Sequence, residues 1–122
     1  MDVHVFKKMR VKQGISGKVF YALEAYLDLI KQQDVIDFNG ENPTFLHLFV
    51  TSKKEYDERI QEILPLLKET SRLWISYKKS TNKIKYDINR DSFFDLGLRD
   101  GIFPFANVAL DEEWSCIGFK KA

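Results

Sequence analysis

The segment 45–50, which reads FLHLFV, constrains the fold more than any other part of the sequence. Its side chains are apolar on both alternating faces, with His47 as the one exception. A strand of this composition is typical of the centre of a parallel sheet, where helices cover both faces. The segment therefore predicts an α/β fold and places His47 in or near the core.

Helical and strand patterns alternate before this segment. Apolar residues at three- and four-residue spacing predict a short helix near residues 5–9, and residues 18–22 have the composition of a first buried strand. Residues 35–38 form a short candidate edge strand. Between these strands lies a predicted helix over 23–33, whose apolar face is formed by Leu23, Tyr26, Leu27 and Ile30.

The alternation continues after the central segment. Ser52 and Glu55 have the spacing of a capping box, and Pro65 predicts a kink or a break in the helix that starts there. Three strands and one helix follow: a strand over 73–77, a helix between Asn89 and Gly101, and a hairpin of strands 105–110 and 114–119. This order predicts three layers, with helices on both faces of a mixed, mostly parallel sheet of about six strands that ends in an antiparallel hairpin.

Length and composition restrict the function further. The 122 residues fit one domain, 1–122, and a net charge of +1 provides no overall field for nucleic acid or an anionic membrane. The apolar runs are much shorter than the roughly 20 residues of a membrane span. The charged N-terminal segment and the single cysteine, Cys116, predict a cytoplasmic protein. Only two histidines accompany that thiol, so no metal site is expected.

Four motifs give the sequence a resemblance to a known family: HLFVTSKKE, LPLLK, LWISYKKSTNKIKYDINRDS and DEEWS. Through them, nearly the whole chain resembles a small family of bacterial proteins that is known only as a domain of unknown function. The order of elements is similar to a class I methyltransferase-like Rossmann fold that lacks its middle α/β unit. The resemblance implies a Rossmann-like sheet with the last strand inserted antiparallel beside strand 73–77, and it implies no particular activity.

Methyltransferases of this fold bind their cofactor at a glycine-rich turn after the first strand, because residues without a Cβ let the backbone approach the ligand. Here the turn is residues 22–26, ALEAY, without a glycine. Leu23 and Tyr26 would fill the space that the methionine part of S-adenosylmethionine occupies. Asp34 or Asp37 could imitate the acidic residue that binds the ribose of the cofactor, but a single carboxylate is a weak signal. We therefore expect no cofactor, with a degenerate S-adenosylmethionine-dependent methyltransferase as the alternative.

A basic, hydroxyl-rich loop follows strand 73–77, at the rim where the carboxyl ends of the parallel strands meet. Open α/β sheets bind ligands at this rim, so the loop is a candidate site for a small anion. The candidate residues are Lys53, Lys78, Lys79, Ser80, Thr81 and Trp114. Alternatively, the acidic turn 111–113 pairs with the lysines, which then need no ligand. Both interpretations remain open at this stage.

No catalytic residue is expected. His47 has no nucleophile motif such as G-x-S-x-G beside it, and we interpret it as a core histidine bonded to backbone. Cys116 has no visible catalytic partner and is interpreted as a packing residue. The sequence thus favours a non-catalytic domain that binds a small anionic ligand or a protein partner. The edge strands 35–38 and 105–110 are the candidate surfaces for a protein.

Overall fold

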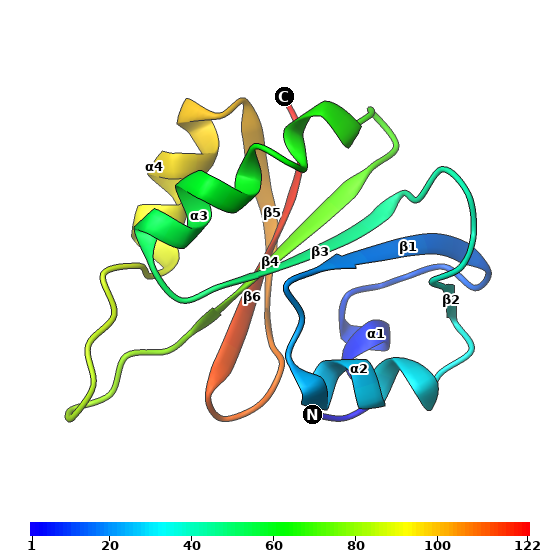
Figure 1. Ribbon diagram of the computed structural model, residues 1–122, viewed down its shortest axis with the longest axis horizontal. Helices are drawn as coiled ribbons and strands as arrows, with labels where there is room; N and C mark the ends of the chain where they lie inside the picture. Colours follow the sequence, from blue (N-terminus) through cyan, green and yellow to red (C-terminus); the bar gives the residue numbers. More distant parts are fainter.

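Strands and helices alternate along the chain, and the computed structural model describes residues 1–122 (Figure 1). The helices are α1 (Val5–Lys8), α2 (Glu24–Lys31), α3 (Lys53–Ile60), the 3-10 helix η1 (Leu64–Leu66) and α4 (Arg90–Arg99). The strands are β1 (Ile15–Phe20), β2 (Ile36–Asp37), β3 (Phe45–Val50), β4 (Arg72–Lys78), β5 (Ile102–Ala109) and β6 (Trp114–Lys121). No helix combines the length and apolar character that crossing a bilayer requires.

The six strands form one sheet in the order β2-β1-β3-β4-β6-β5. The pairs β2–β1, β1–β3 and β3–β4 are parallel, whereas β6 is antiparallel to both β4 and β5. In this register Leu48 of β3 lies beside Ile75 of β4, which lies beside Ile117 of β6. The predicted fold class and the insertion of the last strand are therefore confirmed.

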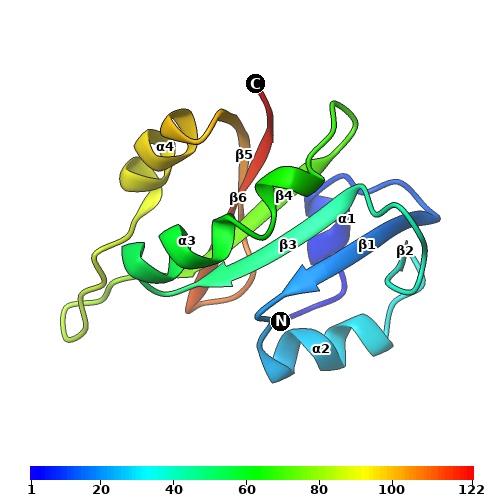
Figure 2. The same cartoon turned by 45° about the horizontal axis from the view of Figure 1, so that its top comes forward.

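Helices cover both faces of the sheet (Figure 2). All six residues of β3 are buried, as the FLHLFV pattern predicts. Leu46 and Leu48 belong to the core under α3 and α4, while Phe45 and Phe49 belong to the core under α1 and α2. Burying each apolar side chain of this size stabilises the folded state by about 1.5–3 kcal/mol relative to leaving it exposed. The central strand thus anchors both layers.

The start of α3 differs in one contact from the predicted capping box. Ser52 Oγ accepts the backbone N–H of Glu55 at 3.1 Å, as expected. The Glu55 carboxylate, however, accepts the N–H and the hydroxyl of Thr51, at 2.6 and 2.8 Å, instead of the N–H of Ser52. The predicted break at Pro65 is confirmed, because α3 ends before this residue and Pro65 lies within η1.

The ends of α4 follow the sequence prediction. Asn89 Oδ1 accepts the N–H of Ser92 at 3.0 Å, and Ser92 Oγ accepts the N–H of Asn89 at 2.8 Å. At the other end, Gly101 has a φ of +79°, in the left-handed region that glycine enters without steric cost. These two residues set where α4 begins and where the chain turns back into β5.

Several strand boundaries and one helix face differ from the prediction. β1 (Ile15–Phe20) overlaps the predicted range 18–22 but starts earlier, and it also ends earlier because Tyr21 adopts a φ of +59° and leaves the sheet. β5 likewise begins at Ile102 and not at residue 105. On α2, Tyr26 and Leu29 are buried, whereas Leu27 is 41% exposed. Residues three apart share a helix face but adjacent residues do not, so the two buried positions exclude Leu27 from the core.

Candidate functional site

The sheet order places a topological switch point at the carboxyl ends of β1 and β3, and the space between the segments that follow these two strands is called the crevice below. From β1 the chain crosses to β2 on one side, and it then returns past β1 to form β3 on the other side. Ligands of open α/β sheets bind at such a switch point, because the two flanking connections diverge there. The residues that follow β1 and β3 therefore decide whether this crevice is open.

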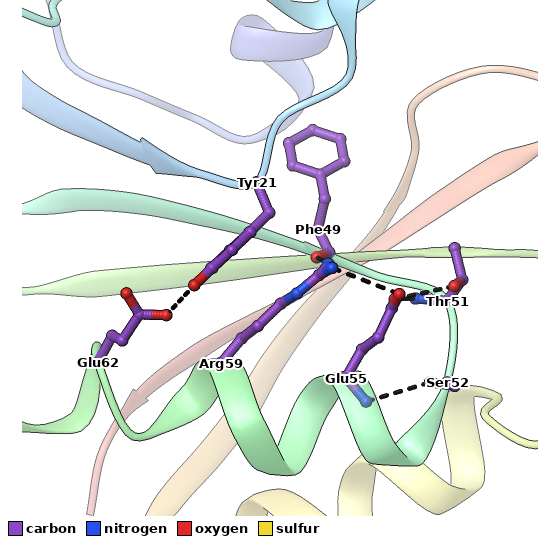
Figure 3. Close-up of polar contacts among 7 residues, drawn as sticks. All are labelled: Tyr21, Phe49, Thr51, Ser52, Glu55, Arg59 and Glu62. Atoms are coloured by element: carbon purple, nitrogen blue, oxygen red, sulfur yellow. Dashed lines mark hydrogen bonds and ion pairs between the residues drawn. The ribbon is translucent and has the colours of Figure 1, made fainter.

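On the face covered by α3, side chains bridge the crevice (Figure 3). The hydroxyl of Tyr21, which follows β1, donates to the carboxylate of Glu62, and this bond raises the pKa of Tyr21. The guanidinium of Arg59 lies 4.2 Å from the centre of the Tyr21 ring and donates to the Phe49 carbonyl at 2.8 Å. An ion pair, 3.3 Å long, joins Arg59 to Glu55. The turn after β1 is thus tied to α3 and to β3.

On the opposite face, the side chain of Tyr26 is fully buried under α2. Its hydroxyl lies 2.8 Å from His47 Nδ1, and the other ring nitrogen of His47 lies 2.5 Å from Ser76 Oγ. The rings of Phe6 and Phe49 pack edge-on against Tyr26, with centroids 6.2 and 5.0 Å away. Tyr26 therefore occupies the space above the central strand, while Leu23 is half-buried beside it.

His47 is buried as predicted, but its partners differ from the prediction. Side-chain hydroxyls, not backbone groups, bind both of its ring nitrogens. Burial lowers the pKa of His47 to about 3, so the ring is neutral at pH 7. A neutral imidazole has one donor and one acceptor, and hydroxyls can serve either nitrogen. This is how the core accommodates a histidine.

The pair of Ser76 and His47 has the contact expected of a nucleophile and its base. Both side chains are fully buried, however, so no substrate reaches the serine hydroxyl. Cys116 lies beside Ser76 on β6, and burial raises the pKa of its thiol to about 12. A protonated, buried thiol is a poor nucleophile. The cluster therefore serves the packing of the sheet.

The lysines of the predicted anion site lie close to groups of the chain itself. The backbone N–H of Lys53, at the start of α3, donates to the Asp87 carboxylate at 3.0 Å. Lys78 Nζ is 3.9 Å from the Glu113 carboxylate, and Lys79 Nζ donates to the Asp111 carbonyl at 3.1 Å. The acidic turn thus lies against the two lysines, as the alternative interpretation expects.

The other predicted residues also have internal contacts. The hydroxyl oxygens of Ser80 and Thr81 accept the backbone N–H groups of Tyr86 and Ile84, at 2.9 and 3.0 Å. Trp114 is only 7% exposed and packs edge-on against the ring of Phe49. The structure therefore places the six residues along one end of the sheet, each with contacts to the chain itself. Anion binding at this rim stays a prediction.

A hollow that was not predicted from the sequence lies at the opposite end of the parallel strands. This cleft of about 710 Å³ is lined by the end of α1, by the first residues of β3 and β4 and by the middle of β5. Sequence inspection offers one signal for it: the basic residues Lys8, Arg10 and Lys12, which alternate along the N-terminal segment. Nowhere in the structure do three His, Cys, Asp or Glu side chains gather as a metal site would require.

Comparison with known proteins identifies the fold but no relative in sequence. No protein-family model matches the chain, and no curated protein matches it. The resemblance to a small bacterial family of unknown function therefore stays a prediction. The likeness is to solved structures, at sequence identities that establish a shared fold alone.

Three of these structures illustrate the likeness. Magnesium protoporphyrin IX methyltransferase from Synechocystis, with bound S-adenosylmethionine, has a TM-score of 0.59 at 7% identity, over 97% of this chain and 74% of that one. LepI in complex with the same molecule gives 0.57 at 12% identity over 98% of this chain, and mitomycin 7-O-methyltransferase MmcR gives 0.56 at 9% over 90%. The chain spans only 39% of LepI and 49% of MmcR. It has the Rossmann-like fold of class I S-adenosylmethionine-dependent methyltransferases.

Proposed function

We propose that the chain is a non-catalytic binding domain built on the methyltransferase fold. The observation that carries the proposal is the burial of Tyr26 between α2 and the central strand, where its hydroxyl contacts His47. The turn before it contains no glycine, and Tyr21 and Arg59 bridge the other face of the same crevice. The chain's own side chains thus stand where a cofactor of this fold would enter.

The cost of displacing Tyr26 supports the same proposal. A cofactor entering above the central strand would have to expel the Tyr26 ring from the core, which costs about 3–5 kcal/mol by analogy with removing a buried aromatic side chain. A conformational cost of about 4 kcal/mol lowers the apparent affinity roughly 1000-fold. Even a site with otherwise good contacts would then bind S-adenosylmethionine only weakly.

The alternative function is that of a degenerate S-adenosylmethionine-dependent methyltransferase. What favours it is the fold likeness to structures that hold S-adenosylmethionine. This alternative requires α2 to move away from the sheet so that Tyr26 leaves the crevice. It therefore makes a binding prediction opposite to that of the leading proposal.

Titration with S-adenosylmethionine separates the two functions. We expect no heat of binding and no amide shifts in ¹H–¹⁵N spectra at ligand concentrations up to about 1 mM. Titration to this concentration detects binding free energies of about −4 kcal/mol or stronger. The same titration with S-adenosylhomocysteine controls for the charge of the sulfonium. A dissociation constant in the micromolar range, with shifts at residues 21–26, would favour the methyltransferase.

The rim lysines remain the proposed contact for a small anion, because the hydroxyl groups of Ser80 and Thr81 can still donate while they accept backbone bonds. This proposal predicts that inorganic phosphate raises the melting temperature of the wild-type protein and that Lys79→Ala removes most of the rise. Lys31→Ala, at an exposed position on α2, is the matched control. An equal rise in both variants would exclude the rim as the place where phosphate binds.

A further inference from the structure

The cleft at the amino ends of β3 and β4 combines a basic mouth with an aromatic floor. Trp74 and Phe45 form part of its floor and are almost completely buried. Phe105 forms one wall, is 43% exposed and packs edge-on against Trp74 with centroids 5.4 Å apart. Small-molecule pockets are concave and are lined mainly by apolar and aromatic side chains, with a few polar or charged groups. The volume of about 710 Å³ is within the range of such pockets.

Two features of the sheet fix the position of Phe105. The register between β5 and β6 shifts between Pro104 and Ala106, so Phe105 is the extra residue of a β-bulge. On β6, a Cβ at Gly118 would lie only 2.8 Å from the Phe105 ring and 3.0 Å from Trp74. Bulges re-aim a side chain, and the glycine leaves room for the re-aimed ring. The aromatic wall is therefore built by specific backbone features.

The charged residues that line the cleft all carry the same sign. They are Lys8, Arg10, Lys12 and Arg72, and no aspartate or glutamate lines the cleft. None of the four takes part in an ion pair of the structure. This differs from the rim, where Lys78 lies beside Glu113. A hollow lined by one sign of charge focuses the field and raises the local concentration of counter-ions.

Arg72 is held in place by its surroundings, and Arg10 occupies an unusual backbone position. Arg72 Nη1 donates to the carbonyls of Glu69 and Ser71, at 3.2 and 2.8 Å, and its guanidinium lies 5.8 Å from the centre of the Phe105 ring. Arg10 follows α1 with a φ of +56°, at a position where helices usually place glycine. The sequence thus keeps an arginine at the cleft where glycine would fit the backbone better.

We propose that this cleft binds a small molecule with a flat aromatic body and an anionic group, a carboxylate or a phosphate. The aromatic body lies against Phe105 and the apolar floor, and the anion lies among Arg10, Arg72 and the neighbouring lysines. A cation–π contact and charge-assisted hydrogen bonds then act on the same ligand. This site lies at the opposite end of the parallel strands from the crevice, so it goes beyond the proposed function and does not depend on it.

A small molecule fits this cleft better than a nucleic-acid strand. Single-stranded nucleic acid requires a positive groove that continues along the backbone, with several aromatic platforms in succession. Here the cations surround one hollow, and the net charge of the whole chain is only +1. A ligand with one anionic group and one aromatic body matches the cations and the aromatic wall of the cleft.

The test uses 2-naphthyl phosphate as the probe. 2-Naphthol, which has only the aromatic part, and inorganic phosphate, which has only the anionic part, are the controls. Calorimetry measures affinity and ¹H–¹⁵N spectra locate the site. We expect 2-naphthyl phosphate to bind at least about ten-fold more tightly than either half, because the charge-assisted and aromatic contacts add. We expect its amide shifts at residues 44–45 and 105–108 and at the Trp74 indole. Equal affinity for 2-naphthol, or shifts confined to the crevice residues 21–26, would overturn the proposal.

Three variants separate binding from folding. We expect Arg72→Gln to weaken 2-naphthyl phosphate binding about ten-fold or more, since it removes a charged donor. Arg10→Gly should weaken binding while raising the melting temperature, because glycine suits the positive φ. Lys31→Gln, an exposed lysine on α2, should change neither. Wild-type affinity in both arginine variants, or cleft shifts with a thymidine oligonucleotide but none with 2-naphthyl phosphate, would refute the site.

Discussion

Replacing Tyr26 by alanine is expected to lower the free energy of unfolding by about 4 kcal/mol, because a fully buried aromatic ring is lost and a cavity remains. The substitution also leaves His47 Nδ1 without its partner in a dry environment, where an unpaired polar group costs about 1–3 kcal/mol. Urea unfolding at neutral pH, followed by far-UV circular dichroism, measures the change. The predicted loss is a large part of the stability of a domain of this size.

Two further variants keep this prediction testable if the alanine variant fails to fold. Tyr26→Phe retains the ring and removes only the hydroxyl, so we expect a loss of about 1–2 kcal/mol. Leu27→Ala, at the neighbouring but 41% exposed position on α2, should cost less than about 1 kcal/mol. If Tyr26→Phe and Leu27→Ala were equally mild and Tyr26→Ala no worse than either, Tyr26 would not fill the crevice as the structure indicates.

The fold was largely predictable because its signals are local. The segment FLHLFV indicates burial on both faces without reference to any other segment, and β3 has the predicted bounds 45–50. Asn89, Ser52 and Gly101 act within a few residues of their own position in the chain, so their roles at helix ends could be inferred from short motifs. The helix face of α2 was partly wrong, because Leu27 fits the apolar spacing equally well and only the sheet decides which positions it covers.

The chemistry of the interior and the surface depends on contacts between distant segments. His47 meets Tyr26 and Ser76, which lie 21 and 29 residues away in the sequence. A sequence pattern shows that the histidine is buried but does not show which hydroxyls approach its two nitrogens. The basic cleft is assembled in the same way from four separate segments, so only the cations near α1 were visible as a local pattern.

Acidification is expected to destabilise the protein through His47 before most carboxylates titrate. Burial lowers the pKa of this ring from 6.5 to about 3 in the folded state. Between these two values the unfolded chain binds one more proton than the folded chain, so the free energy of unfolding falls with pH by about 1.4 kcal/mol per unit. Lowering the pH from about 7.5 to about 5 should therefore cost about 2 kcal/mol.

The titratable groups that face the His47 ring do not change charge in this pH range, so they do not contribute to the slope. Tyr26 and Cys116, on the elements packed against it, both have pKa values raised by burial and stay neutral throughout this range. Urea unfolding at several pH values gives the slope directly. His47→Gln should be less stable at about pH 7.5 but nearly independent of pH down to about 5, since the titrating group is gone. A wild-type protein equally stable at both pH values would mean that a proton reaches His47 without unfolding, and that the core above β3 is open to water.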